Sequence, residues 1–224
     1  MGQDTIITTA ESLREQVERA LASRIVVGEI PAGEVLTVPR LAAEYGVSAT
    51  PMREAMLNLQ RRGFLAPIRN RGFRVTSVTL DELRHIGTVR MLLEAPAMRE
   101  VAGHVPAEVA QHLDALAAQI EITAEQRRFQ DYLEADTTFH LTILELTGNP
   151  YLVGVVRDLR QRTRLTGIVR SADAGTLIES AREHRELVRL LVAGDGEGAE
   201  ALMRQHIGHI AGVWSGLSDE AVSQ

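Results

Sequence analysis

Three histidines and one aspartate of this 224-residue chain lie among apolar residues at helical spacing. Asp136 and His140, in EADTTFHLTILELTGN, are four residues apart, so their side chains share one face of a helix. Leu133 and Leu144 flank them on that face, which therefore points into a protein interior. Burying an unpaired ionisable group costs free energy, so this pair needs a partner there.

Two later stretches repeat the pattern around His184 and His206. The apolar residues on the two faces are Leu177, Ala181, Leu187 and Leu191 beside His184, and Leu202, Ile210 and Val213 beside His206. Imidazoles and a carboxylate from three helices can meet around one divalent cation. The alternative is that each histidine is a hydrogen-bonded core residue and that Asp136 and His140 make only a local hydrogen bond. The residue pattern alone leaves both open.

The donor types restrict the ion that such a site would hold. The chain has no cysteine, so thiolate ligation is impossible. Imidazole and carboxylate suit Zn²⁺, Ni²⁺, Mn²⁺ or Fe²⁺, and we expect Zn²⁺. Four protein ligands leave positions on a six-coordinate ion for water or for the carboxylate of a small organic acid.

Long helical patterns from residue 80 onwards must position these side chains, and they predict an all-α antiparallel helical bundle. The breaks between them contain proline and glycine, and Asn149-Pro150 reads as a helix cap and not as a site. The expected helices span residues 80–103, 106–124, 127–147, 150–172, 174–193 and 196–217.

The first third of the chain has a different pattern. Helical spacing predicts three helices, from Leu13 to about Gly28, from Val38 to Gly46, and from Ser48 or Thr50 to about Arg62. GEIPAGEVL is expected to be a turn segment, and FLAPI and FRVTSV are expected to be strands on either side of the turn RNRG. This order is that of a winged helix-turn-helix. The predicted fold is therefore mostly α, with a winged helix-turn-helix followed by a helical bundle.

Charge is distributed unevenly along the chain. The formal net charge is −6, but residues 1–76 hold ten arginines against eight acidic residues. Residues 77–224 hold fourteen arginines against twenty-two acidic residues. A basic N-terminal part on an acidic body is typical of a nucleic-acid-binding domain joined to another domain.

The start of the third helix, GVSATPMREAM, suits contact with DNA. In a helix-turn-helix the second helix of the pair lies in the major groove and contacts base edges with its N-terminal residues. Ser48 and Thr50 are short, Pro51 fixes the helix entry, and Arg53 can form two hydrogen bonds to guanine. The alternative is a solvated basic face with Ser48 and Thr50 as a simple cap. Further candidate phosphate or minor-groove contacts are Arg40, Arg69, Arg71 and Arg74.

The run VGEIPAGEVLTVPRLAAEYGVSATPMREAMLNLQRRGFLAPIRNRGFRV resembles the DNA-binding domain of GntR-family bacterial transcription regulators. The resemblance implies that SATPMRE contacts the operator and that RNRG is the wing. The expected DNA-binding residues are Arg40, Ser48, Thr50, Arg53, Arg69, Arg71 and Gly72. Ala49 stands where the family usually has arginine, so the operator sequence of relatives need not apply.

Residues 80–217 resemble the C-terminal ligand-binding domain of the FadR subfamily of GntR regulators. Metal-binding members place Asp, His, His and His where Asp136, His140, His184 and His206 stand. The resemblance implies a small organic acid as effector, and Arg90 matches an arginine that could bind its carboxylate. The alternative for Arg90 is a surface ion pair with Glu94 at i+4.

These features predict a metabolite-responsive transcription regulator, a repressor, and not an enzyme. The expected partners are a palindromic double-stranded operator, a second copy of the chain in a homodimer, and a small carboxylate effector. Alternatives are a regulator that responds to the metal ion itself, or a metal-dependent enzyme.

No apolar stretch is long enough to span a bilayer, so we expect a cytoplasmic, nucleoid-associated protein without a membrane partner. The expected segments are a tail at 1–10, the DNA-binding domain at 11–76, a linker at 77–80, the effector-binding and dimerisation domain at 81–217, and a tail at 218–224.

Overall fold

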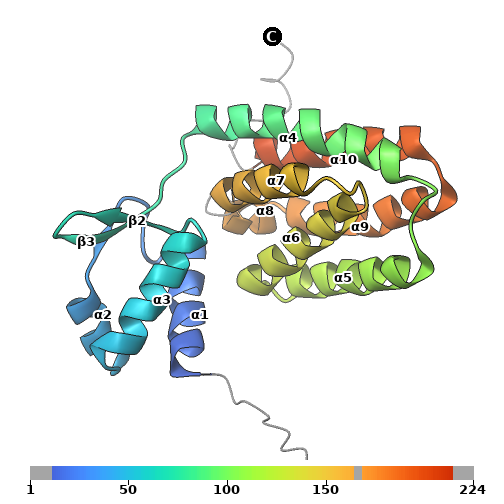
Figure 1. Ribbon diagram of the computed structural model, residues 1–224. Coiled ribbons are helices and arrows are strands. Elements are labelled where there is room, and N and C mark those ends of the chain that lie inside the picture. The colour runs from blue at the N-terminus through green and yellow to red at the C-terminus, as the bar shows by residue number, and fades with distance from the viewer. Residues whose placement is uncertain (1–11, 164–167, 214–224) are drawn as a thin grey trace, which may run out of the picture. The chain divides into compact units, whose positions relative to one another are not determined.

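The structure, a computed structural model, describes residues 12–163 and 168–213 (Figure 1). The chain divides into two compact units, residues 1–76 and 77–224, and each is mostly helical in its described part. The predicted tails at 1–10 and 218–224, and the predicted end of the last helix near residue 217, lie outside the described residues. The side chains of Ile210 and Val213 also lie outside the description.

Three helices form most of the first unit, at the predicted places. They are α1 (Leu13–Val26), α2 (Val38–Tyr45) and α3 (Ala49–Arg61). Helix α1 begins with a reciprocal capping box between Ser12 and Glu15. Helix α3 contacts both α1 and α2, and it buries an apolar face made of Met52, Ala55, Met56 and Leu59. Packing of this face fixes the direction in which the opposite, exposed face of α3 points.

A small antiparallel sheet completes the first unit. Its strands are β1 (Val35–Leu36), β2 (Leu65–Ile68) and β3 (Gly72–Val75), in the order β1-β3-β2. The predicted hairpin of β2 and β3 is confirmed, but the expectation that GEIPAGEVL is only a turn segment is wrong. This segment ends in β1, where Leu36 is fully buried opposite Phe73. Two residues are too few to show a strand pattern, so β1 depends on its pairing with β3.

All the secondary-structure elements in the described part of the second unit are helices. Its helices are α4 (Leu80–Val101), α5 (Ala107–Glu125), α6 (Phe129–Glu145), α7 (Pro150–Thr163), α8 (Ile168–Asp173), α9 (Thr176–Ala193) and α10 (Gly196–Val213). The single helix expected over 150–172 is described as α7 and α8, and residues 164–167 between them lie outside the description. The cap predicted at Asn149 is confirmed, because its Oδ1 accepts hydrogen bonds from the backbone N–H groups of Tyr151 and Leu152 at 3.1 and 3.2 Å.

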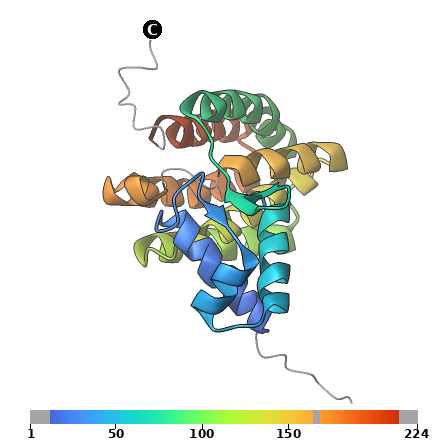
Figure 2. The same cartoon turned by 90° about the vertical axis from the view of Figure 1, so that its left-hand side faces the viewer.

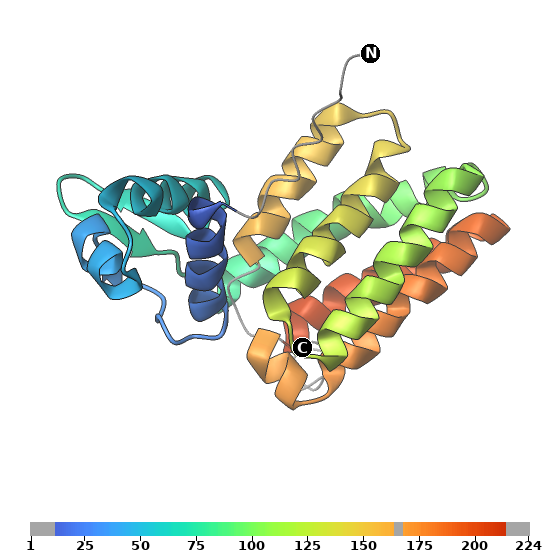
Figure 3. The same ribbon diagram turned by 90° about the horizontal axis from the view of Figure 1, so that it is seen from below.

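The helices of this unit pack so that α6, α9 and α10 share one interior. Helix α4 lies alongside α10 and also contacts α7 (Figures 1 and 2). Helix α5 contacts both α6 and α9, with which it runs side by side when the unit is seen from below (Figure 3). Fully buried side chains, among them Phe139, Leu144 and Met203, fill the space between the helices. Among the described helices, none combines the length and the apolar content that crossing a membrane requires.

Candidate metal centre

The structure brings together all four residues that the sequence singled out in the bundle. Asp136 and His140 project from α6, His184 from α9 and His206 from α10. The three histidines are 0%, 1% and 2% exposed, so they are effectively removed from water. One potential ligand atom from each residue lies within 4.8 Å of the other three. These four side chains therefore form one buried cluster that could hold a metal ion.

Distances inside the cluster are short. Nε2 of His140 lies 3.2 Å from Nε2 of His184, and Oδ1 of Asp136 lies 3.1 Å from the same nitrogen of His184. Oδ1 of Asp136 is 3.6 Å from Nε2 of His140. The ring of His206 completes the cluster, with its centroid 4.8 Å from that of His184 and 5.1 Å from that of His140.

The other ring nitrogens of two histidines are held by partners that fix the tautomer. Nδ1 of His184 lies 3.1 Å from the backbone carbonyl oxygens of both Ser180 and Ala181, which can only accept a hydrogen bond. Nδ1 of His206 lies 2.6 Å from Oε2 of Glu183. Both histidines therefore carry a hydrogen on Nδ1 and a lone pair on Nε2. Such outer partners are the usual way in which proteins orient metal-ligating histidines.

Some polar atoms of the cluster have no partner. Nε2 of His206 and Nδ1 of His140 are buried without a hydrogen bond to any described residue. Buried polar atoms are normally paired, because leaving one unpaired costs about 1–3 kcal/mol. A lone pair on His206 Nε2, turned toward two imidazoles and a carboxylate, fits a divalent cation as the missing partner.

Burial also sets the charge state of the cluster. Burial, with the nearby Arg160, holds the pKa of His140 well below its ordinary value. Burial likewise lowers the pKa of His206. Burial alone would raise the pKa of Asp136, but the close imidazoles of His140 and His184 and the charge of Arg160 outweigh it and hold that pKa well below its ordinary value. The site thus combines the ionised carboxylate of Asp136 with the neutral imidazoles of His140 and His206, which are forms that bind metal.

A buried chain of charged groups adjoins the cluster, and sequence reasoning missed most of it. Nη1 of Arg160, on α7, donates to Oδ2 of Asp136 at 3.0 Å. Nε and Nη2 of Arg160 lie 3.1 and 2.5 Å from Oε2 of Glu94, on α4. Burial raises the pKa of Glu94, but Arg160 and Arg90 outweigh it and bring the pKa to about 2. Arg160 lies on the apolar face of α7 with Val153 and Val156. This position in the sequence pattern could have shown that the arginine points into the bundle.

Arg90 belongs to the same chain of charges. Its Nε donates to Oε1 of Glu94 at 2.6 Å, so the i+4 pair considered as an alternative exists, but it is buried and not at the surface. The arginine is 2% exposed, and its Nη2 has no hydrogen-bond partner among the described residues. An unsatisfied cationic N–H inside the bundle is therefore available to an anionic ligand.

The predicted DNA-contacting residues lie on the surface of the first unit. Ser48 is the N-cap residue of α3, and its hydroxyl makes no capping hydrogen bond within the described residues. Thr50 and Arg53 are exposed on the first turns of α3. Arg69 and Arg71 are exposed in the turn between β2 and β3. Arg40 is also exposed, and its Nη2 lies 2.6 Å from Oε1 of Glu34.

Gly72 has a structural role at the end of that turn. Its φ of 109° lies in the region that favours glycine, and a Cβ at this position would collide with the backbone carbonyl oxygen of Leu36 in β1. Asn70, two residues earlier, also has a positive φ, of 57°. The wing therefore owes its shape to these two backbone positions.

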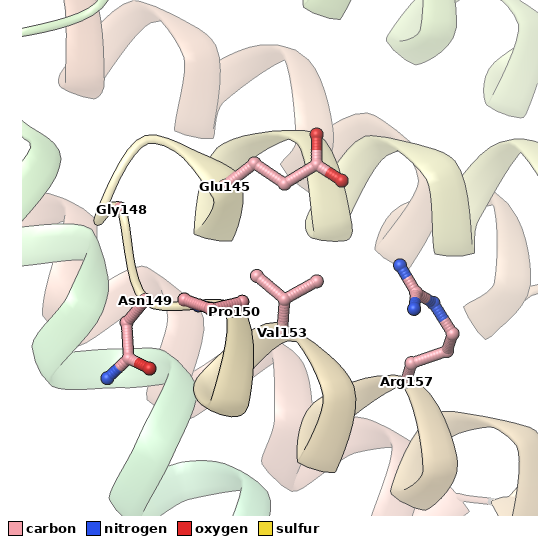
Figure 4. A pocket seen from close by; sticks show the side chains of 6 residues that line it. All are labelled: Glu145, Gly148, Asn149, Pro150, Val153 and Arg157. Atoms are coloured by element: carbon pink, nitrogen blue, oxygen red, sulfur yellow. The ribbon is translucent and has the colours of Figure 1, made fainter.

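A hollow of about 370 Å³ opens on the surface where α6 turns into α7 (Figure 4). Its lining comes from Glu145, Gly148, Asn149, Pro150, Val153 and Arg157. None of the residues of the buried cluster lines this hollow. It is therefore separate from the candidate metal centre.

Two family models match the sequence. The model for bacterial regulatory proteins of the gntR family matches residues 13–75, and the model for the FCD domain matches residues 85–209. The chain belongs to the GntR family. This GntR-family chain is a DNA-binding transcription regulator and not an enzyme. The alternative prediction of a metal-dependent enzyme is therefore wrong. Its place in the FadR subfamily stays a prediction.

Similar proteins agree with this assignment along nearly the whole regulator. The HTH-type transcriptional repressor RspR of Escherichia coli is 23% identical over 94% of this chain and 92% of its own length. The HTH-type transcriptional regulator McbR of E. coli is 26% identical over 88% of this chain and 91% of its own. The solved structure of E. coli McbR/YncC has a TM-score of 0.66 at 25% identity, covering 88% of this chain and 94% of that one. A GntR structure from Rhodococcus sp. RHA1 shares the fold, with a TM-score of 0.68 at 20% identity over 92% and 98% of the two chains.

Proposed function

We propose that this GntR-family regulator is a metabolite-responsive repressor whose FCD domain binds a divalent metal ion, Zn²⁺, together with a small organic acid. The observation that carries the proposal is the buried cluster of Asp136, His140, His184 and His206, in which Nε2 of His206 has no partner among the residues that the structure describes. The donor set also accommodates Ni²⁺, Mn²⁺ or Fe²⁺. The ion would orient the effector, and no chemical step is required of it.

The charges around the cluster support an anionic effector. Arg90 and Arg160 are balanced by Glu94 and Asp136, and Glu183 is the further carboxylate at the cluster. A divalent ion adds two positive charges, of which Glu183 offsets one. The remaining positive charge favours a carboxylate, which Arg90 would bind through its unpartnered Nη2.

The exposed start of α3 supports direct reading of an operator. Ser48 and Thr50 leave the helix N-terminus accessible to a phosphate, and Arg53 extends from its first turn. Arg69 and Arg71 in the turn before Gly72 would contact the flanking backbone or the minor groove, and Arg40 would reach phosphate once released from Glu34.

An exposed stripe on α4 supports a homodimer. Val89 and Leu92 are 41% and 65% exposed, and Pro96, one turn further on the same face, is also exposed. Burial of this stripe against a second copy would remove apolar surface from water. Two DNA-binding units joined in this way would read a palindromic operator.

DNA binding is tested with a labelled duplex from upstream of the protein's own gene. Arg53→Ala should weaken binding about 5- to 150-fold, which corresponds to the ~1–3 kcal/mol of an arginine–guanine contact. Arg189→Ala, at an exposed arginine of α9, is the matched control and should bind like wild type. Wild-type protein that fails to bind at moderate salt, with Arg53→Ala behaving identically, would refute the DNA-reading assignment.

Effector and metal are tested by thermal unfolding. Wild-type protein is screened against sugar acids, hydroxy acids and dicarboxylates, with and without EDTA, and the active acid should raise the melting temperature only when metal is present. If free Zn²⁺ changes DNA affinity and no organic acid does, the protein is instead a sensor of the metal ion, since the cluster alone suffices for that function. A melting temperature and ligand response that EDTA leaves unchanged would contradict the metal site.

A further inference from the structure

Arg160 is a buried cation beside the candidate metal centre. It is neither one of the proposed metal ligands nor the residue proposed to bind the effector, so its role is open. It is 2% exposed on α7, and its guanidinium touches carboxylates from two other helices. A buried arginine with one carboxylate would be a simple ion pair. A buried arginine that contacts both a candidate metal ligand and a carboxylate on a second helix can also transmit a change of charge or position at the ligand to that helix.

On the metal side, Arg160 determines how the carboxylate of Asp136 is turned. Oδ2 accepts a hydrogen bond from Nη1 of Arg160 at 3.0 Å, and Oδ1 lies 3.1 Å from Nε2 of His184. The two oxygens therefore have different partners, and rotation of the carboxylate would break both contacts. Arg160 thus keeps Oδ1 directed at the imidazoles.

On the other side, Arg160 is anchored to α4. Its Nε and Nη2 both contact Oε2 of Glu94, while Oε1 of Glu94 accepts a hydrogen bond from Arg90 on the same helix. All three side chains are buried, so a change in one charge cannot be screened by water. The contacts run without a gap from Asp136 on α6, through α7, to α4.

Helix α4 is the element through which the second unit is joined to the first along the chain. The units divide between Thr76 and Ser77, and α4 begins at Leu80. Its first turn is fixed by a capping box, in which Thr79 Oγ1 and the Glu82 backbone N–H are 3.2 Å apart and Oε2 of Glu82 lies 2.8 Å from the Thr79 backbone N–H. A shift of α4 is therefore passed directly to the three residues that precede it.

We propose that Arg160 is a positioning residue of the metal centre, which orients Asp136 toward the ion and couples occupation of the centre to α4 through Glu94. With a cation bound, Asp136 offers Arg160 less negative charge, so Arg160 is held more strongly by Glu94. This inference rests on the proposed metal site and adds the route by which that site acts on the helix leading to the DNA-binding unit.

The first test compares Zn²⁺ affinities of the full-length protein by competition with a chromophoric chelator. Arg160→Lys keeps the positive charge but lacks the planar guanidinium whose separate nitrogens contact Asp136 and Glu94. It should therefore weaken Zn²⁺ binding about 10- to 100-fold, as loss of an outer partner does. Arg157→Lys, one turn earlier and exposed on α7, is the matched control and should bind Zn²⁺ like wild type. Thermal midpoints in EDTA show whether each variant is folded.

A double-mutant cycle separates positioning from a merely structural role. If Arg160 acts through Asp136, then Arg160→Lys should weaken Zn²⁺ binding no further in an Asp136→Asn background. Wild-type affinity in Arg160→Lys, or effects that add fully in the double variant, would overturn the inference while leaving the metal site intact. Absence of Zn²⁺ binding by wild-type protein would refute the proposed site itself.

The coupling to α4 is tested by a separate measurement, which does not require that Arg160→Lys folds. Hydrogen exchange of the α4 amides is measured with Zn²⁺ and with EDTA. Wild-type protein should show a zinc-dependent change in protection along α4, and Glu94→Gln, which weakens the anchor of Arg160, should lose most of that change. An equal change in wild-type protein and Glu94→Gln, or no change in wild-type protein, would contradict the coupling.

Discussion

Nε2 of His140 lies 3.2 Å from Nε2 of His184 in a site that excludes water. Nδ1 of His184 faces two carbonyl oxygens and must carry the hydrogen, so Nε2 of His184 presents a lone pair. The hydrogen between the two rings then belongs to His140, which leaves its Nδ1 with a lone pair and, among the described residues, without a partner. One nitrogen of this pair, Nδ1 of His140, is therefore left without a hydrogen bond among the described residues.

His206→Leu should abolish metal binding while the fold persists. The substitution removes one of four ligands and places an apolar side chain in a buried position. Wild-type protein with Zn²⁺ at 100 times its dissociation constant should gain about 2.7 kcal/mol of unfolding free energy, and the variant should gain almost none. Thermal and urea unfolding with Zn²⁺ or EDTA measure the difference.

The matched control for this substitution is His104→Leu, at an exposed histidine outside the cluster. It should keep the full zinc-dependent stabilisation. Equal stabilisation of His206→Leu and wild type would show that His206 is not a ligand.

Glu94→Gln should destabilise the second unit by an amount that depends on pH. The folded-state pKa of Glu94 is about 2, below its ordinary value of 4.5, because the charges of Arg160 and Arg90 outweigh the cost of burial. A depressed carboxyl pKa contributes stability that is present above pH 4.5 and is lost as the pH falls toward 2. Urea unfolding in EDTA should show a loss of about 3 kcal/mol at pH 6 that shrinks between pH 4.5 and 2.

Glu186→Gln provides the comparison, because Glu186 pairs with Arg189 on the exposed face of α9. Exposed ion pairs contribute little to stability, so this variant should unfold like wild type across the same pH range. A pH-independent loss of stability in Glu94→Gln would show that the carboxylate charge is not what holds the two arginines.

Gly72→Ala should destabilise the first unit more than Gly33→Ala. Both glycines have a positive φ, 109° and 86°, so each alanine is strained by about 1–3 kcal/mol. At Gly72 a Cβ also meets the backbone of Leu36, whereas at Gly33 no described atom lies within 4 Å of the Cβ position. Thermal unfolding and DNA binding of the two variants measure the difference, and equal losses would mean that β1 moves aside freely.

Local pattern was sufficient for most helices and for the four cluster residues. Leu133 and Leu144 around the α6 pair, and Leu177, Ala181 and Leu187 around His184, are all buried as their spacing predicts. A side chain that repeats every three to four residues must share a face with its neighbours, so periodicity alone shows which histidines point inward. The winged helix-turn-helix follows in the same way from three periodic stretches and a turn.

Periodicity could not predict which side chains on different helices pair with one another. Arg160 and Glu94 are 66 residues apart, and although the apolar face of α7 marks Arg160 as pointing inward, nothing in the sequence indicates that it pairs with Glu94. The two-residue strand β1 exists because β3 pairs with it, and Gly72 must be glycine because Leu36 passes close by. The sequence alone therefore determined which faces are buried and which residues could bind a metal ion. Only the tertiary structure decided which charges neutralise one another, because that depends on how helices distant in the chain pack together.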